Sequence, residues 1–309
     1  MRIVSIGEVL WDIIGQAEYL GGAPFNFAAH VKRLGHAVFF ISAVGADQRG
    51  VRILERMAEM GLSTRYVRRV EDQATGTVTV KLDSAGQPQF VIHRPAAFEF
   101  PQLSDSDIHD LFSEQPDWIY FGTLLQMSKP ARELTLRLID SARPARRFYD
   151  VNLRSDSYEP SLVHELMSLA TVVQLNQEEA SQIGRTFGCP HSSLEGFCRS
   201  YAKRFNWEAV CITQGAAGCA LLIGDEYVQA KGYEADVVDT VGAGDAFAAA
   251  FVHGLGCGWR AMEIADFANR VGALVASRAG ATPAWTIEET KAFVRCNDPR
   301  SHPKEATVI

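Results

Sequence analysis

The sequence predicts an α/β protein in which helices cover both faces of a central, mostly parallel sheet. Short apolar runs alternate with amphipathic helical patterns along most of the chain, an order that favours parallel strands joined by helices. Hydrophobic residues make up 47% of the 309 residues and charged residues 22%, so a core of ordinary size is expected. One stretch of alternating residues interrupts this order and predicts a smaller β structure attached to the main fold.

The first part of the chain establishes the alternation. Helical spacing of apolar residues and a glycine at each helix end define the helices, and β-branched and aromatic runs define the strands. The expected elements are a strand at 2–7, a helix at 24–34, a strand at 37–44 and a helix at 48–60.

Residues 66–100 depart from this order. Residues 75–82 alternate in polarity, residues 83–86 form a turn cluster, and residues 89–93 are extended again. A hairpin without an adjacent helix predicts a small lid, built mainly from about residues 66–100 with a contribution from about residues 10–20. The alternative is an edge hairpin of the main sheet, because periodicity does not locate an element in space.

The alternation then resumes and points to one large domain over residues 1–296. Residues 297–309 are polar and are expected to form a loose tail. The expected elements are strands at 117–121, 146–150, 171–175 and 209–213, helices at 129–142, 161–169 and 194–205, a hairpin at 219–230, and a helical region at 243–279.

Composition excludes several classes of protein. The net charge of −7 lacks the basic footprint of a general nucleic-acid binder. No secretory signal and no apolar stretch of membrane-spanning length is present, and the six cysteines form no C-x-x-C pair. We therefore expect a cytoplasmic protein with reduced thiols and with neither nucleic acid nor membrane as a partner.

A run of small residues before a carboxylate is the most informative motif. Gly242, Ala243 and Gly244 precede Asp245, and a helical pattern follows. Backbone N–H groups at such a helix start can bind an anion, aided by the positive end of the helix dipole. Asp245 in the first turn could then accept a proton from a hydroxyl that attacks a phosphoryl group. The alternative is that Asp245 only caps the helix.

A second glycine-rich segment lies near the N-terminus. Gly21 and Gly22 allow the backbone to approach a ligand closely. Asn26 follows in the first helical turn, with a donor and an acceptor that suit a polyol. Asp12 lies just after the first strand, at the edge where ligands of open α/β sheets bind. Taken singly, Asp12 and Asn26 could equally serve a turn and a cap.

Standard nucleotide and zinc fingerprints are absent from the sequence. It contains no G-x-x-x-x-G-K-[ST], no complete dinucleotide-binding loop, no H-E-x-x-H and no zinc-spaced Cys/His cluster. These absences disfavour P-loop NTPases, dehydrogenases and zinc hydrolases.

Together the two glycine segments resemble the paired motifs of the ribokinase-like sugar kinases, also called the phosphofructokinase B family. Residues 239–247 are similar to the family's C-terminal motif, residues 21–28 to its N-terminal motif, and the match spans roughly residues 2–295. The segments GEVLWD at 7–12, NQEE at 176–179 and TQGAAG at 213–218 resemble its substrate-Asp, N-x-x-E and nucleotide-binding elements. The resemblance implies a three-layer α/β/α ribokinase-like fold with a small β-sheet lid.

The same resemblance implies ATP-dependent phosphorylation of a sugar hydroxyl. Asp245 would be the general base, and the amides of Gly242, Ala243 and Gly244 would form the anion hole. The lid would exclude water and could form a homodimer interface. The other implied roles are sugar binding by Asp12, Gly21, Gly22, Asn26, Arg94, Asn152 and Arg154, nucleotide binding by Asn176, Thr213, Gly215, Gly218 and Asn269, Mg²⁺ binding through water by Asn176 and Glu179, and a K⁺ site, which only some members have, at Asp239, Val241 and Gly280.

The identity of the sugar depends on a few positions. DVNLR at 150–154 resembles both fructokinases and ketodeoxygluconate kinases, and Arg154 suits either an acidic substrate or a partner carboxylate. GGAP at 21–24 favours fructokinases, whereas RPAAFE at 94–99 has Phe98 where fructokinases have Asp. The arginines at 94 and 154 could also form surface ion pairs.

We expect a fructokinase-like enzyme that converts fructose and MgATP to fructose 6-phosphate. The alternatives are a kinase for 2-keto-3-deoxygluconate or another ketose, and a nucleoside or vitamin kinase of the same family. A non-catalytic regulator that binds a sugar or a nucleotide is a further alternative, disfavoured by the intact base and anion hole.

Overall fold

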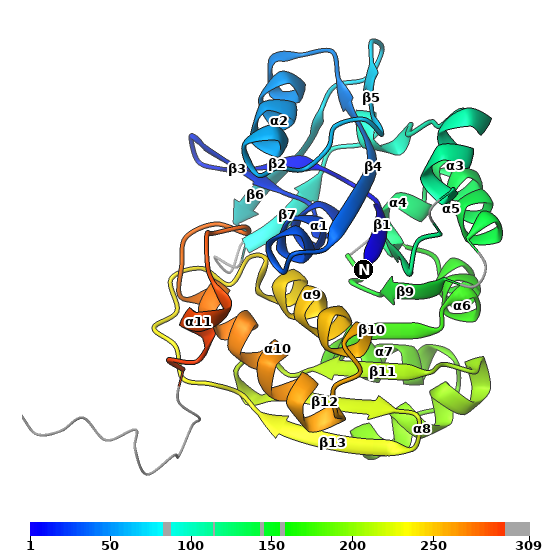
Figure 1. Cartoon of the computed structure of the whole chain (residues 1–309), viewed down its shortest axis with the longest axis vertical. Coiled ribbons are helices and arrows are strands. Elements are labelled where there is room, and N and C mark those ends of the chain that lie inside the picture. Colours follow the sequence, from blue (N-terminus) through cyan, green and yellow to red (C-terminus); the bar gives the residue numbers. More distant parts are fainter. Residues whose placement is uncertain (83–87, 114, 143–144, 155–157, 294–309) are drawn as a thin grey trace, which may run out of the picture.

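The computed structural model describes residues 1–82, 88–113, 115–142, 145–154 and 158–293, and these residues form two sheets. The larger sheet has the strand order β13-β12-β11-β10-β9-β8-β1-β4-β5, and the smaller has the order β3-β2-β6-β7. Figure 1 shows helices on both sides of the larger sheet, with the smaller sheet set apart from it. This arrangement confirms the predicted fold class.

The larger sheet is parallel from β11 to β5 and antiparallel at its other edge, where β12 and β13 form a hairpin. The parallel strands end at one common edge, which brings residues just after β1, β9, β10 and β11 together. The strands are β1 (Arg2–Ile6), β4 (Ala37–Gly45), β5 (Val67–Val70), β8 (Trp118–Gly122), β9 (Arg146–Asp150), β10 (Val172–Asn176), β11 (Ala209–Thr213), β12 (Gly218–Ile223) and β13 (Glu226–Lys231).

Two apolar clusters, one on each face, hold the helices to the larger sheet. Successive residues of a strand point to opposite faces, so Ile3 joins one cluster and Val4 the other. The cluster with Ile3 receives α1 (Ala23–Arg33), α2 (Gln48–Glu59), α9 (Ala243–Gly256) and α10 (Ala261–Ala276). The cluster with Val4 receives α3 (Asp105–Phe112), α4 (Thr123–Gln126), α5 (Lys129–Ser141), α6 (Pro160–Leu169), α7 (Gln177–Thr186) and α8 (Leu194–Phe205).

The smaller sheet combines two hairpins that are distant in sequence. The strands β2 (Leu10–Ile14) and β3 (Ala17–Gly21) are antiparallel, as are β6 (Gly76–Leu82) and β7 (Pro88–Ile92), and β2 joins the hairpins by pairing parallel with β6. The predicted hairpin is therefore not an edge of the main sheet. Val67–Val70, which the prediction included in the lid region, pairs with β4 in the larger sheet.

Other local expectations differ from the structure in identifiable ways. Residues 105–112 and 177–186 form helices that the apolar spacing did not predict. Both begin with a capping box, at Ser104 and Asn176, which stabilises a short helix with few apolar residues. The helical region at 243–279 is two helices, because the backbone N–H of Arg260 binds the Glu263 carboxylate and starts a new helix there.

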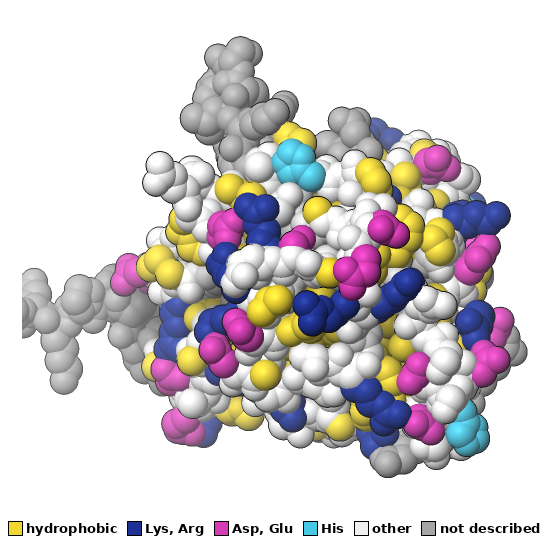
Figure 2. Space-filling view, turned by 90° about the horizontal axis from the view of Figure 1, so that it is seen from above, with side chains coloured by type: hydrophobic (Ala, Val, Ile, Leu, Met, Phe, Trp, Pro, Cys, Tyr) yellow, Lys and Arg dark blue, Asp and Glu magenta, His cyan; other side chains and the backbone are white. Residues whose placement is uncertain are grey.

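The expectations about the thiols and the C-terminal tail are covered only in part by the described residues. The cysteines at 189, 198, 211, 219 and 257 are free thiols. Cys296 and the expected tail at 297–309 lie outside the described residues. Within the described part of the chain, no helix has the length and apolar character needed to cross a membrane. On the face shown in Figure 2, acidic and basic side chains are interspersed rather than grouped by sign.

Candidate active site

A cavity of about 1140 Å³ lies between the carboxyl edge of the larger sheet and the smaller sheet. It brings together most of the predicted site residues, although they come from segments far apart in the sequence. The predicted residues that line it are Asp12, Gly22, Asn26, Arg94, Asn152, Arg154, Asn176, Glu179, Thr213, Asp239, Val241, Gly242, Gly244, Asp245 and Gly280.

The N-terminus of α9 forms one wall of this cavity. Gly242 is the N-cap with φ of 79°, and a Cβ there would lie 2.3 Å from the carbonyl oxygen of Ala281, so only glycine fits. A Cβ on Gly244 would meet open space, which shows that the backbone at this residue faces the cavity. The Ala243 N–H donates to Thr240 O at 3.3 Å, a long hydrogen bond that leaves Gly242 and Gly244 as the better candidate donors to an anion.

Asp245 lies in the first turn of α9 and is held from the opposite side of the cavity. The Asn26 amide nitrogen donates to Asp245 Oδ2 at 2.8 Å, which joins α1 to α9. Burial raises the pKa of Asp245 to about 6, while the Asn26 hydrogen bond and the charge of Arg154 oppose that rise. The carboxylate is therefore ionised at neutral pH but close to the pH at which it accepts a proton.

Asn26 is placed by the turn that begins α1. Gly22 is the N-cap with φ of 112°, and a Cβ there would lie 2.5 Å from the carbonyl oxygen of Glu8. Pro24 occupies the first turn, where its missing N–H costs nothing. This close approach of α1 to the end of β1 aims the first turn at the cavity, as the glycine-rich segment predicted.

Glu8 is a cavity residue that the sequence argument did not single out. Its side chain is 6% exposed, and its Oε2 atom has no hydrogen-bond partner among the described residues. Burial raises its pKa to about 7. A carboxylate directly after the first strand was the available signal, because that position lies at the ligand-binding edge of the sheet.

Asp12 and Gly21 pack directly against each other in the β2–β3 hairpin. A Cβ on Gly21 would lie 2.4 Å from Asp12 Oδ2, so the glycine leaves room for the carboxylate. Burial raises the pKa of Asp12 to about 6, Arg154 opposes that rise, and Asp239 adds to it. Asp12 is thus available to accept hydrogen bonds inside the cavity.

The end of β9 and the segment after it add a buried acid and an exposed base. The hydroxyl of Tyr120 donates to Asp150 Oδ2 at 2.8 Å, and burial raises the pKa of Asp150 well above its ordinary value. Burial therefore disfavours the ionised form of Asp150. Asn152 and Arg154 line the cavity, and Arg154 is exposed at its rim.

Asn176 and Glu179 form the capping box of α7. Glu179 N donates to Asn176 Oδ1 at 2.8 Å, and Asn176 N donates to Glu179 Oε2 at 2.8 Å. Glu179 Oε1 accepts from the Leu153 N–H at 2.7 Å. Asn176 and Glu179 also line the cavity, and oxygen donors of this kind fit contact with a hydrated Mg²⁺. Across the described residues, no group of three or more His, Cys, Asp or Glu side chains could hold a metal ion directly.

Asp239 connects two loops at the cavity wall. Its Oδ1 accepts from the Val241 N–H at 3.0 Å, and its Oδ2 accepts from the Gly280 N–H at 3.1 Å. The three residues named for a potassium site are therefore neighbours.

Some predicted nucleotide residues lie outside the cavity lining. Gly215 and Gly218 lie at the turn η2 (Gly215–Ala217) and the start of β12. Asn269 on α10 is 7% exposed, and its amide donates to the carbonyl of Lys231 at 3.3 Å. Of the predicted nucleotide residues on β11, η2, β12 and α10, only Thr213, at the end of β11, lines the cavity.

Arg94 lines the cavity and is paired with a buried carboxylate rather than in a surface ion pair. Its Nε donates to Glu99 Oε1 at 2.8 Å, and Glu99 is 5% exposed in the turn η1 (Ala97–Glu99). Phe98, the position at which the sequence departs from fructokinases, is fully buried in the apolar cluster of Val4. The buried carboxylate of this turn thus stands one residue later, at Glu99.

Comparison with known proteins agrees with this geometry. The family model described as pfkB family carbohydrate kinase matches residues 3–288. A fructokinase of Klebsiella pneumoniae is 30% identical over 267 residues, covering 82% of this chain and 84% of the relative. Two further relatives, which are 28% and 27% identical to this chain, have names that specify phosphoryl acceptors other than fructose.

Solved structures show the same fold. An uncharacterized sugar kinase from Pyrococcus horikoshii superposes with a TM-score of 0.80 at 29% identity, covering 94% of this chain and 96% of that chain. Fructokinase with bound ATP from Xylella fastidiosa superposes with a TM-score of 0.82 at 24% identity, covering 94% and 97% of the two chains. The match of the family model along nearly the whole chain shows that this protein belongs to the pfkB family of carbohydrate kinases.

Proposed function

We propose that this protein is an ATP-dependent kinase for a neutral ketose and that it converts fructose to fructose 6-phosphate. The observation that supports this most directly is the meeting of Asp245, the N-terminus of α9 and Asn26 in one cavity. A carboxylate next to backbone donors fits a base beside an oxyanion, the arrangement that phosphoryl transfer to a hydroxyl needs.

Each part of the site has a separate task in this reaction. Asp245 takes the proton of the attacking hydroxyl. The N–H groups of Gly242 and Gly244, at the positive end of the α9 dipole, stabilise the charge that develops on the transferred phosphoryl group. Asn176 and Glu179 would hold Mg²⁺ through water, and the ion would neutralise phosphate charge. The nucleotide would lie along Thr213, Gly215, Gly218 and Asn269.

Orphaned acceptors in the cavity favour a substrate rich in hydroxyl groups. Asn26 Oδ1 and Gln174 Oε1 are buried without a partner among the described residues. The orientation of both amides is fixed, because Asn26 donates to the Asp245 carboxylate and Gln174 donates to the carbonyl of Gly244 at 3.3 Å. Each of the two oxygens can therefore accept a hydrogen bond, which a hydroxyl group of a polyol would donate.

The charge of the cavity favours a neutral acceptor. Arg94 is neutralised by Glu99, and Arg154 is the other basic residue of the lining. Arg154 acts electrostatically on Glu8, Asp12, Asp150, Glu179 and Asp245. A substrate carboxylate would meet this excess of acids. The second candidate, 2-keto-3-deoxygluconate, is favoured only by the exposure of Arg154 at the rim.

Two further features belong to the same proposal. The smaller sheet acts as a lid over the acceptor and forms the homodimer interface. Asp239, Val241 and Gly280 would hold a potassium ion beside the anion hole. The closeness of Asp239 to both loops supports the second point.

Acceptor-dependent release of ADP tests the function. Purified protein with MgATP is assayed with fructose, 2-keto-3-deoxygluconate, ribose, tagatose and adenosine, and ³¹P NMR of the product identifies the phosphorylated hydroxyl. Fructose is expected to give the highest kcat/KM. Preference for ketodeoxygluconate would move the assignment to a sugar-acid kinase, and sugar binding without turnover would indicate a non-catalytic regulator.

A further inference from the structure

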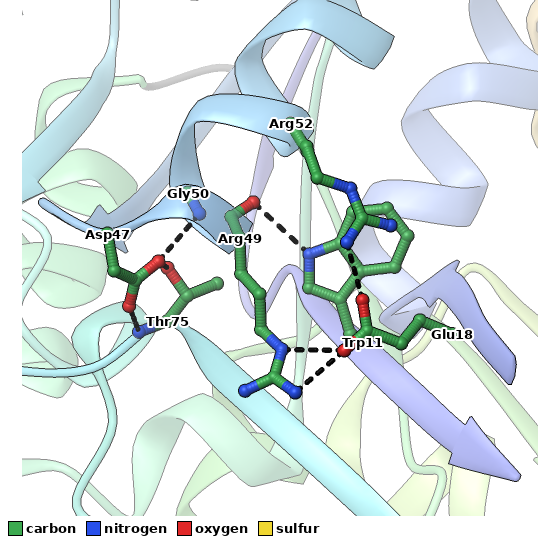
Figure 3. Close-up of polar contacts among 7 residues, drawn as sticks. All are labelled: Trp11, Glu18, Asp47, Arg49, Gly50, Arg52 and Thr75. Atoms are coloured by element: carbon green, nitrogen blue, oxygen red, sulfur yellow. Dashed lines mark hydrogen bonds and ion pairs between the residues drawn. The ribbon is translucent and has the colours of Figure 1, made fainter. Parts of the chain in front are cut away.

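The first turn of α2 contacts the β2–β3 hairpin through a group of charged side chains (Figure 3). Arg49 donates to Glu18 Oε1 from Nε at 2.8 Å and from its terminal nitrogen at 2.6 Å, and Arg52 donates to Glu18 Oε2 at 2.5 Å. Both oxygens of one carboxylate are therefore held by two guanidinium groups. The Glu18 side chain is 21% exposed and the side chains of Arg49 and Arg52 are 43% and 39% exposed, so dissolved salt can screen these contacts.

Trp11 extends this contact into the core. The Arg52 guanidinium lies 4.2 Å from the centre of the Trp11 ring, and Trp11 Nε1 donates to the carbonyl of Arg49 at 3.2 Å. Trp11 is 4% exposed. The stacked guanidinium and the indole hydrogen bond fix this ring from α2.

Asp47 ties the other hairpin to the same helix. As the N-cap of α2, its Oδ1 accepts from the Gly50 N–H at 2.8 Å and from the Thr75 hydroxyl at 2.7 Å. Its Oδ2 accepts from the Thr75 N–H at 2.8 Å, just before β6 begins. The start of α2 thus anchors both hairpins of the smaller sheet (Figure 3).

The position of the β2–β3 hairpin bears directly on the acceptor site. β3 is an edge strand of the smaller sheet and pairs only with β2. Along β2, Trp11 contacts α2 and Asp12 lines the cavity, as alternation along a strand requires. Contacts that fix Trp11 and Glu18 therefore also fix Asp12, which belongs to the same hairpin.

We propose that Glu18, Arg49 and Arg52 are positioning residues for the acceptor, which they never touch. Their cluster holds the β2–β3 hairpin against α2 and so sets the fraction of molecules in which Asp12 is ready to bind the sugar. This inference rests on the proposed function only in taking the cavity as a sugar site. Apparent affinity falls in proportion to that fraction, while the step after binding is unchanged.

Glu18→Gln keeps the shape of the side chain and removes its charge. We expect the KM for fructose to rise about fivefold, the scale of one well-placed ion pair. The kcat and the KM for ATP should change less than about twofold, because Thr213 and the candidate nucleotide turn lie at β11 and β12, away from the hairpin. Added NaCl should raise the wild-type KM for fructose towards the value of the variant and leave the variant unaffected.

A mutant cycle separates this role from general stability. The double change Glu18→Gln, Arg49→Gln should raise the KM for fructose no more than Glu18→Gln alone, because the Arg49 side chain acts through Glu18. Arg52 is kept, because it also stacks on Trp11. Arg56→Gln is the matched control, because Arg56 forms an exposed pair with Glu59 on the same helix. It should leave the KM for fructose unchanged.

Hydrogen exchange provides a measurement that does not depend on turnover. In Glu18→Gln, the amides of residues 10–14 and 17–21 should exchange at least about threefold faster, with β1 unchanged. An unchanged exchange rate, an additive effect in the Glu18→Gln, Arg49→Gln double variant, or an equal rise in the KM for ATP would overturn the proposal. Faster exchange in a protein that phosphorylates no sugar would support the positioning cluster and remove the proposed function instead.

Discussion

Asp245 has the two properties required of a base that works near neutral pH. Burial raises its pKa to about 6, so it is ionised in the resting site yet accepts a proton readily. The Asn26 amide nitrogen donates to Asp245 Oδ2 at 2.8 Å and holds the carboxylate toward the acceptor side of the cavity. These features distinguish it from a simple helix cap, which would accept a backbone N–H of its own helix.

Replacing Asp245 with Asn should lower kcat at least about 100-fold, because the variant cannot take the proton. The affinity for ATP, measured by calorimetry, should change little. Asp225→Asn, in the turn between β12 and β13, is the control and should keep full activity. Turnover near the wild-type rate in Asp245→Asn would rule out this base.

The pH dependence of kcat/KM should reflect the ionisation of Asp245 together with that of Asp12, whose pKa is also about 6. We expect kcat/KM to fall as the pH drops through about 6, since the base must be ionised. Asn26→Ala removes a hydrogen bond that lowers this pKa, so the acidic limb should move to higher pH. The same variant should raise the KM for sugar more than the KM for ATP. If the acidic limb of Asn26→Ala lies at the same pH as that of the wild type, Asn26 does not lower the pKa of the base.

At the level of elements, α1 joins the acceptor side of the cavity to a loop on its far wall. Asn26 and His30 lie one turn apart on this helix. His30 Nε2 lies 3.0 Å from the Ala281 carbonyl, and Trp285 Nε1 donates to His30 Nδ1 at 3.0 Å. The ring must be neutral to accept from Trp285, and burial lowers its pKa to about 4.

This depressed pKa makes stability depend on pH with a defined sign. The unfolded chain protonates His30 near pH 6.5, whereas the native state does so only near 4, so its stabilising contribution is complete above about 6.5 and is lost between 6.5 and 4. The raised pKa values of Glu8, Asp12 and Asp245 act in the opposite direction.

The histidine contribution is isolated by comparing two proteins. The free energy of unfolding of His30→Gln should change less steeply with acidification than that of the wild type, by up to about 1.4 kcal/mol per pH unit. Urea unfolding at a series of pH values measures both slopes. Identical slopes would show that His30 does not titrate in this range.

For the whole molecule, the balance of charge predicts that the proposed reaction requires a divalent cation. The cavity offers two arginines, one of them paired with Glu99, against several carboxylates. Backbone amides alone cannot neutralise a triphosphate in such surroundings. Excess EDTA should abolish acceptor-dependent ADP release, and added Mg²⁺ should restore it. Full activity in the chelator would contradict this role of the metal.

The sequence predicted those features of the fold and the site that depend on the local pattern of residues. The apolar run at residues 2–7 predicted a strand, and the GAGD motif at 242–245 predicted the start of a helix. Both features depend on neighbouring residues in the sequence, and both predictions are confirmed. The burial of Glu8, which raises its pKa, depends instead on tertiary contacts. The pairing of Arg94 with Glu99, and of β2 with β6, likewise requires contacts that no local pattern encodes.

The hydrogen bond between Asn26 and Asp245 joins residues that are 219 positions apart in the sequence. During synthesis, Asn26 emerges early, whereas Asp245 emerges only after the last strand, β13, has been made. A nascent chain that contains every strand but ends before residue 245 therefore still lacks the proposed base.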